Sequence, residues 1–307
     1  MRIVLGVDGS EASLTALELV ATTIWPAGTN IRLVGAYEQP LDWSGLASPP
    51  ADTVAHDATQ RTLFTTLQSL SKRLKANTYA IETVVARGRP ADVLLAEAHD
   101  LRADMIIVGS RGLGAAASAL LGSVSATLVD QAPCPVLVVR RPRVTRIVLA
   151  TDGSQSAEAI PAVLLAWNLF RDAPINVLSV TPSSDIARAA LLSALVGGDP
   201  LATDAPHEVD RHGLMAGEMA RRLVAGGRNA EGAMRSGEAA QQIEAAAAEW
   251  GADLIVTGSR GLSGLQRLIM GSVAHHVLLH SRCSVLVMRG HVPARQSREI
   301  MAAVGSV

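Results

Sequence analysis

The residues that could do chemistry in this chain form a spaced glycine motif. Gly109 is followed after two residues by Gly112, and after nine more by Gly122 and Ser123. Gly112 permits a backbone turn and a close approach of a ligand to the main chain. Gly122 and Ser123 are expected to open a helix, and exposed N–H groups at a helix start attract anions. With Arg111 as a nearby cation, the pattern suits a polyphosphate.

A turn that contains an acid lies elsewhere in the same half of the chain. Asp8, Gly9 and Ser10 directly follow a short apolar run. A carboxylate at the end of a strand can accept hydrogen bonds from ribose hydroxyls or from an adenine amino group. The same three residues could instead form a turn and a helix cap that serve only the fold. The residues alone therefore leave phosphate binding and a purely structural role both open.

The chain repeats itself over nearly its whole length. Residues 2–10 return as 146–154, and residues 109–113 return as 258–262. The offset between the copies grows along the chain, which indicates an insertion in the middle of the second copy. Because the period is too long for a solenoid unit, the repeat is a duplicated domain. We expect domains at 1–141 and 144–289 and a C-terminal tail at 290–307, with a short basic connector between the domains.

Each copy alternates strand-like and helix-like patterns. In the first copy the strand-like segments lie at 3–7, 31–36, 81–86, 105–108 and 136–139, and those at 3–7 and 105–108 are continuous apolar runs. Continuous apolar runs joined by helices predict parallel strands buried on both faces, and thus an α/β, doubly wound sheet in each domain. Ligands bind beyond the carboxyl ends of such strands. Both the acid-containing turn and the glycine motif fall there.

Three expectations concern single elements. Ser10 should cap a helix, and the apolar face of that helix is expected to comprise Leu14, Leu17, Val20 and Ile24. In the second copy the third strand, near 230–234, has only a weak apolar pattern. A short helix is expected at 191–196, within the long connection that precedes this strand.

Composition excludes several classes of protein. With 27 Lys and Arg against 28 Asp and Glu, the net charge of −1 argues against duplex DNA, and 3% aromatic residues argue against a base-stacking platform. No nucleic-acid partner is therefore expected. Neither a targeting segment nor a membrane span is evident, and two cysteines suit a reducing compartment, so we expect a cytoplasmic protein. The GxxxxGK[ST], GxGxxG and GxSxG motifs do not occur.

The histidines and cysteines carry weak signals. His275, His276 and His280 cluster after the second glycine motif, and the last two have a spacing suited to one metal ion. No Cys, Asp or Glu of a ligand set follows closely in the sequence, so no metal site is predicted. Cys134 and Cys283 each precede a final strand, and we interpret them as small buried hydrophobic residues.

The Asp-Gly-Ser turn and the Gly-x2-Gly-x9-Gly-Ser pattern, both present twice, resemble those of the universal stress protein family. The resemblance is to its ATP-binding class and covers nearly the whole chain, which looks like a tandem member. It implies a five-stranded parallel sheet in the order 3-2-1-4-5 in each domain, flanked by helices. It further implies that the two domains pair through their last strands, 136–139 and 285–288.

The resemblance also implies one nucleotide site in each domain. An aspartate would contact the nucleoside, the residue at the second strand end would meet adenine through its backbone, and the glycine loop would hold the phosphates. The implied first-site residues are Asp8, Ser10, Ala36, Gly109, Arg111, Gly112, Gly122, Ser123 and Val124. Those of the second site are Asp152, Ser154, Val180, Gly258, Arg260, Gly261, Gly271, Ser272 and Val273.

One departure between the copies concerns a loop that could lie near the phosphates. Gly88-Arg89-Pro90 in the first copy becomes Gly237-Glu238-Ala239 in the second. If this loop lies beside the phosphates, the carboxylate of Glu238 would weaken anion binding at the second site.

The leading hypothesis for function is an ATP-binding regulatory protein of the stress response. The implied cofactor is ATP, with or without Mg²⁺, and an unidentified regulatory protein would read the bound state. The sequence designates no general base for water, so no catalytic residue is predicted. The alternatives are a slow ATPase or phosphotransferase and a nucleotide-free interaction scaffold. Further homodimerisation is left open, and no membrane partner is expected.

Overall fold

The computed structural model describes residues 1–38, 51–74, 79–112, 121–182, 205–259 and 270–289. The chain divides into two compact units, Met1–Arg143 and Val144–Val307. The helix expected at 191–196 and the C-terminal tail lie outside the described residues. Among the described helices, none combines the length and the apolar character that crossing a membrane requires.

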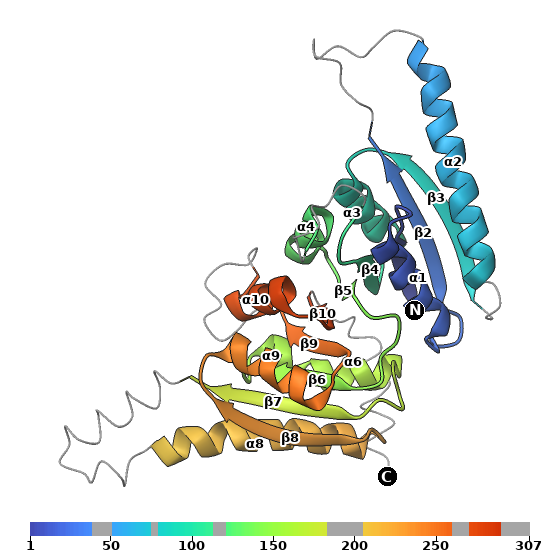
Figure 1. Cartoon of the computed structure of the whole chain (residues 1–307). Helices are drawn as coiled ribbons and strands as arrows, with labels where there is room; N and C mark the ends of the chain where they lie inside the picture. Colours follow the sequence, from blue (N-terminus) through green and yellow to red (C-terminus); the bar gives the residue numbers. More distant parts are fainter. Residues whose placement is uncertain (39–50, 75–78, 113–120, 183–204, 260–269, 290–307) are drawn as a thin grey trace. The chain divides into compact units, whose positions relative to one another are not determined.

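The first unit is a five-stranded parallel sheet with helices around it (Figure 1). Its strands are β1 (Arg2–Gly6), β2 (Asn30–Tyr37), β3 (Ala80–Arg87), β4 (Met105–Gly109) and β5 (Val136–Val139). Its helices are α1 (Glu11–Thr22), α2 (Ala51–Leu74), α3 (Pro90–Leu101) and α4 (Ser123–Gln131). The pairings give the order β3-β2-β1-β4-β5, which confirms the expected topology.

The second unit repeats this topology. Its strands are β6 (Ile147–Thr151), β7 (Ile175–Thr181), β8 (Ala230–Ser236), β9 (Leu254–Gly258) and β10 (Ser284–Met288), in the order β8-β7-β6-β9-β10. Its helices are α5 (Gln155–Glu158), α6 (Ile160–Trp167), α8 (Ala205–Ala225), α9 (Ala239–Trp250) and α10 (Ser272–His280). The weakly patterned third strand does form, as β8. Pairing of the two units through their last strands stays a prediction.

The central strands are buried on both faces, as the continuous apolar runs predict. Ile3 and Leu5 of β1 and Ile106 of β4 are all fully buried. Burial removes apolar side chains from water and stabilises the sheet at roughly 25 cal/mol per Å². Since β1 and β4 pair as neighbours at the centre of the sheet, their carboxyl ends lie side by side.

The apolar face expected for the first helix is wrong at two positions. Ser10 does cap α1, and Leu17 and Val20 are buried. Leu14 is 36% exposed, because the buried face of α1 is rotated toward positions 13, 16 and 19. Ile24 is 82% exposed, because α1 ends at Thr22. The C-cap at residue 23 is extended, so Ile24 no longer follows the helical period.

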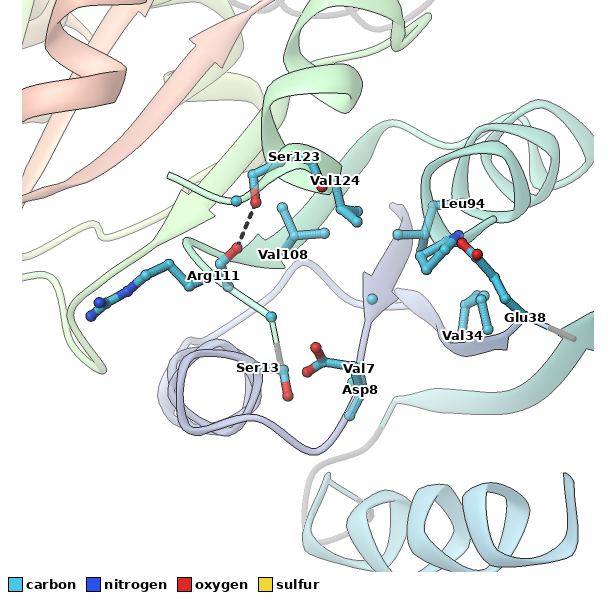
Figure 2. A pocket seen from close by; sticks show the side chains of 17 residues that line it. Val7, Asp8, Ser13, Val34, Glu38, Leu94, Val108, Arg111, Ser123 and Val124 are labelled. Atoms are coloured by element: carbon cyan, nitrogen blue, oxygen red, sulfur yellow. Dashed lines mark hydrogen bonds between the residues drawn. The ribbon is translucent and has the colours of Figure 1, made fainter. Parts of the chain in front are cut away.

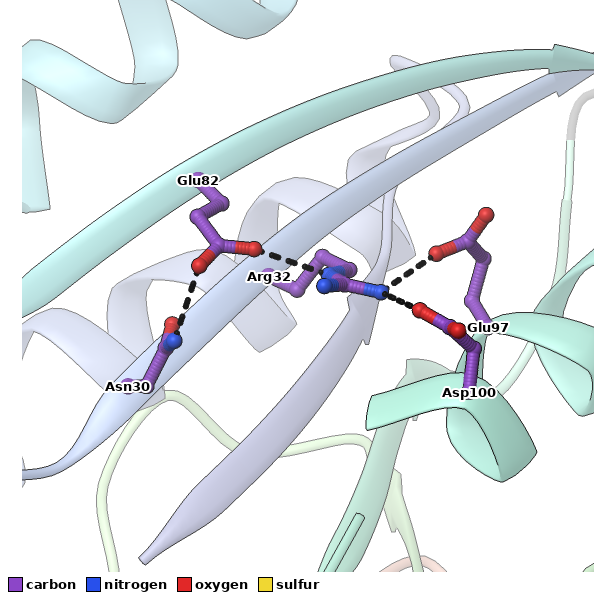
Figure 3. A network of polar contacts seen from close by, with 5 residues as sticks. All are labelled: Asn30, Arg32, Glu82, Glu97 and Asp100. Carbon is purple, nitrogen blue, oxygen red and sulfur yellow. Dashed lines mark hydrogen bonds and ion pairs between the residues drawn. The ribbon is translucent and has the colours of Figure 1, made fainter. Parts of the chain in front are cut away.

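A polar junction ties the edge of the first sheet to its covering helix (Figure 3). The Arg32 guanidinium on β2 donates to Glu82 on β3 (3.0 Å) and to Glu97 and Asp100 on α3 (2.8 Å each). These contacts, above all the bond to Asp100, raise the pKa of Arg32. Asn30 donates to the same Glu82 carboxylate (2.9 Å). One cation therefore links two strands and a helix.

Candidate functional site

A cavity of about 500 Å³ opens at the carboxyl ends of β1, β2 and β4, beside the start of α4 (Figure 2). Its lining comes from the strand ends, from α1 and α3, from the loop after β4 and from the first turn of α4. The lining residues are Gly6, Val7, Asp8, Ser13, Val34, Ala36, Glu38, Pro90, Leu94, Val108, Gly109, Arg111, Gly112, Gly122, Ser123, Val124 and Ser125. The cavity thus lies where a doubly wound sheet is expected to bind ligands.

The position of the Asp8 carboxylate depends on a hydrogen-bonded turn and on the glycine at residue 112. Its Oδ1 accepts a hydrogen bond from the Ser10 amide (2.9 Å), which closes the turn after β1. Its Oδ2 lies 2.7 Å from the point that a Cβ on Gly112 would occupy. The carboxylate and the glycine loop can therefore approach each other only because residue 112 has no side chain.

The start of α4 provides the donors for an anion. Gly122 is the N-cap, and no side-chain cap bond satisfies the first-turn amides. The Gly122 amide itself donates to the Ser110 carbonyl (2.7 Å), so it serves the fold. An anion would therefore be bound by the first turn of α4, where Ser123, Val124 and Ser125 line the cavity.

The structure brings most of the first set of implied site residues together. Those that line the cavity are Asp8, Ala36, Gly109, Arg111, Gly112, Gly122, Ser123 and Val124. Ser10 is outside the lining. Its hydroxyl oxygen accepts from the Ser13 amide (3.2 Å), and its hydroxyl donates to the Arg111 carbonyl (3.3 Å). Ser10 therefore connects α1 to the glycine loop.

Two glycine-loop residues have positions that the motif alone does not reveal. The exposed guanidinium of Arg111 extends away from Asp8 (Figure 2). A Cβ on Gly109 would lie 2.5 Å from the backbone carbon of Ala12. Gly109 is thus required for the close packing of α1 on β4, whatever else it contacts.

Several residues that line the cavity were not predicted as site residues from the sequence. Val34, Leu94 and Val108 form apolar walls, which suit the faces of a planar base. Glu38 adds a second carboxylate to the cavity, two residues beyond Ala36. Glu38 follows a predicted strand end, and Val34 and Val108 lie within predicted strands, so the sequence held a signal for these three. Leu94 lies on a helix, and only the packing of α3 on the sheet brings it to the cavity.

The second unit has the same Asp-Gly-Ser turn as the first, but the space beside its glycine is occupied. The Ser154 amide donates to Asp152 Oδ1 (2.9 Å), as in the first turn. A Cβ on Gly153 would lie 2.5 Å from Met215 Sδ on α8, whereas a Cβ on Gly9 would meet nothing within 4 Å. The side chain of Met215 therefore lies against the second turn.

The other residues implied for the second site are described in part. Val180 lies on β7 and Gly258 ends β9, while Gly271 is the N-cap of α10, which begins with Ser272 and Val273. The Gly271 amide donates to the Ser259 carbonyl (2.8 Å), which reproduces the bond made by Gly122. Arg260 and Gly261 lie outside the described residues.

The loop that departs between the copies also differs in structure. Glu238 caps α9 by accepting from the amides of Ala240 and Gln241 (3.2 and 2.8 Å). Arg89, at the corresponding position before α3, makes no side-chain cap bond. Pro90 directly follows Arg89 and lines the first cavity. The position that matches Arg89 therefore carries the negative charge of Glu238, whose carboxylate already accepts hydrogen bonds from the first amides of α9.

The two cysteines lie in the interior, and burial disfavours the thiolate of Cys134. Neither Cys134 nor Cys283 forms a disulfide, and both side chains are buried. Burial, with a smaller contribution from the charge of Asp104, raises the pKa of the Cys134 thiol to about 12. The thiolate is the reactive form, so Cys134 is inert at neutral pH.

Comparison with known proteins places both halves in one family. The model of the universal stress protein family matches residues 1–140 and again 143–289. A universal stress protein of Mycobacterium tuberculosis is 27% identical over 94% of this chain and 96% of its own length. One from Thermus aquaticus is 33% identical over 45% of this chain and 97% of its own length.

A solved structure supports the fold over both units. The universal stress protein of Archaeoglobus fulgidus covers 94% of this chain and 98% of its own, with 19% identity and a TM-score of 0.62. At this identity the likeness shows the fold alone. With the two family matches, it leads to one conclusion: the chain belongs to the universal stress protein family and is a tandem member with one family domain in each half.

Proposed function

We propose that this protein binds ATP, with or without Mg²⁺, and acts as a nucleotide-dependent regulatory protein of the stress response in the cytoplasm. One site would lie in each domain, and an unidentified partner protein would read the bound state. The observation that carries the proposal is the first cavity. It gathers the acid after β1, the backbone near the end of β2 and the first turn of α4 around one space.

The parts of this cavity match the parts of an adenine nucleotide. Asp8 can accept from the ribose hydroxyls, and the walls of Val34 and Leu94 suit the base. The first turn of α4 offers amides and a favourable dipole to the phosphates, at about 0.3–1 kcal/mol for each nearby charge. A cavity of about 500 Å³ lies within the range of small-molecule sites.

Thermal unfolding with and without ATP tests the proposal. A ligand at 100 times its dissociation constant stabilises the native state by about 2.7 kcal/mol, so the melting temperature of the wild type should rise. Asp8→Asn keeps an acceptor for the Ser10 amide but removes the charge that faces the ribose, so its ATP-induced rise should be smaller. An unchanged melting temperature at saturating ATP would favour the nucleotide-free scaffold.

A slow ATPase is the second candidate, and one observation favours it. Glu38 places a carboxylate in the cavity that could orient water. A phosphate-release assay separates the two functions. Turnover that is lost in Glu38→Gln while ATP still binds would identify an enzyme, whereas binding without turnover supports the regulatory role.

A further inference from the structure

Three potential metal ligands meet on one face of the second unit. Glu244 lies on α9, and His276 and His280 lie on α10, which packs against it. One ligand atom from each residue lies within 4.8 Å of the other two. His276 Nε2 is 3.9 Å from Glu244 Oε1, which is too long for a hydrogen bond. The two side chains face each other without closing a direct bond.

The carboxylate of Glu244 has an unmet requirement. Its Oε1 is buried and has no hydrogen-bond partner. A buried polar atom without a partner is costly, and a bound ion can remove that cost. A cation at this point would supply the missing partner.

The histidine rings are arranged as ligands. The His280 Nδ1 lies 3.0 Å from the His276 carbonyl oxygen, which can only accept, so Nδ1 carries the proton. In the neutral ring, Nε2 then keeps its lone pair for a metal. Metal-bound histidines commonly donate their other ring N–H to a backbone carbonyl in this way, which orients the ring. The two rings lie with their centroids 4.2 Å apart, so both can reach one ion.

The duplicated domain shows that the fold does not require these side chains. Helices α3 and α9 have the same length, as do α4 and α10. In the first unit α3 packs against α4, and in the second unit α9 packs against α10. At the matching positions the first unit carries Leu95, Thr127 and Gln131. The contact between α3 and α4 therefore forms without these ligands. Of the two equivalent helix contacts, only the one between α9 and α10 carries the cluster.

We propose that Glu244, His276 and His280 bind one divalent transition-metal ion, and that zinc suits this ligand set best. Two imidazoles and one carboxylate are common zinc ligands, and three protein ligands leave a position for water or an outside group. Zinc–ligand distances of about 2.1 Å in a tetrahedral site require neighbouring ligand atoms to come within roughly 3.4 Å of each other. Small side-chain rotations suffice, because His280 is exposed and the His276 side chain is 42% exposed.

The test is zinc binding by the full-length protein without a histidine tag, measured by competition with a chromogenic chelator. We expect one zinc ion per chain, with a dissociation constant in the micromolar range or tighter. His276→Ala, His280→Ala and Glu244→Gln should each weaken binding by about tenfold to a hundredfold. X-ray absorption at the zinc edge should show nitrogen and oxygen neighbours that include two imidazoles.

His275→Ala is the matched control, because His275 is exposed on the same helix and lies outside the cluster. It should bind zinc like the wild type, and circular dichroism should show all four variants folded. Wild-type binding weaker than about 100 µM would overturn the proposal, as would an equal loss of affinity in His275→Ala. These outcomes are independent of ATP binding, so either proposal can fail without the other.

Discussion

At the scale of single residues, the contact between Asp8 and Gly112 makes the glycine requirement testable. A methyl group on residue 112 would lie 2.7 Å from Asp8 Oδ2, so the carboxylate must move. Residue 112 is exposed, so the fold should tolerate the change. We expect Gly112→Ala to weaken ATP binding about tenfold, or about 1.4 kcal/mol, with little change in melting temperature. Isothermal titration calorimetry measures the first quantity and thermal unfolding the second.

The control for this variant is Gly217→Ala on α8, where a Cβ would meet nothing within 4 Å. It should bind ATP like the wild type. Wild-type affinity in Gly112→Ala would show that the position of Asp8 does not matter for the nucleotide.

Gly109 should behave in the opposite way, because its neighbours are backbone atoms. A Cβ there would lie 2.5 and 2.6 Å from the carbonyl carbon and oxygen of Ala12, which cannot rotate aside. Helix α1 would have to move off β4. We expect Gly109→Ala to lower the free energy of unfolding by about 1–3 kcal/mol, as overpacking does. Urea denaturation measures this loss, and an unchanged midpoint would contradict the packing role.

At the scale of elements, the junction at Arg32 should give the first unit a measurable acid sensitivity. Hydrogen bonds from Asn30 first, and then from Arg32, lower the pKa of Glu82. A carboxyl group whose pKa is lower in the folded state stabilises the fold above its unfolded pKa, near 4.3. That contribution is lost as the pH falls through the folded value. The Glu82 side chain is 46% exposed, so we expect less than about 1 kcal/mol.

Urea denaturation at several pH values checks this expectation. Between about pH 6 and pH 3, Glu82→Gln should lose less stability than the wild type, because it has no proton to take up. In an Arg32→Met background, which lacks one of the two donors, the difference should shrink. Parallel pH profiles for the wild type and Glu82→Gln would contradict a role for this junction.

Elements with a local signature were predictable from the sequence. Continuous apolar runs indicated β1 and β4, and Ser10 marked the N-cap of α1. The apolar face of α1 was not predictable in detail, because the period alone does not fix which side of a helix meets the sheet. Ile24 fits the helical spacing but lies beyond the end of the helix.

The candidate site was predictable where its residues lie at strand ends or in the spaced glycine motif. Asp8, Ala36 and Gly109 lie at or next to strand ends, Gly112 and Gly122 belong to the motif, and all five line one cavity. Contacts made by packed helices leave no sequence pattern. Leu94 reaches the cavity from α3, and Glu244 meets His276 across two helices that are distant in the sequence.

At the scale of the whole molecule, duplication gives two domains of one topology with unequal sites. In the second unit Met215 lies against the Asp-Gly-Ser turn, and Glu238 sets a negative charge at the position that Arg89 holds in the first. A carboxylate near the phosphates opposes their binding. We therefore expect ATP titration to show one tighter and one weaker site, at least about tenfold apart.

A matched pair of variants assigns the two sites, because Asp8 and Asp152 each accept a hydrogen bond from the serine amide two residues on. Calorimetric titration of Asp8→Asn should lose the tight phase, and that of Asp152→Asn should keep it. Met215→Ala frees the space beside Gly153, so it should strengthen the weak phase alone. Equal affinities in the wild type, or loss of the tight phase in Asp152→Asn, would mean that these differences between the units do not govern binding. A weak phase that strengthens in Met215→Ala would show that the Met215 side chain limits nucleotide affinity at the second site.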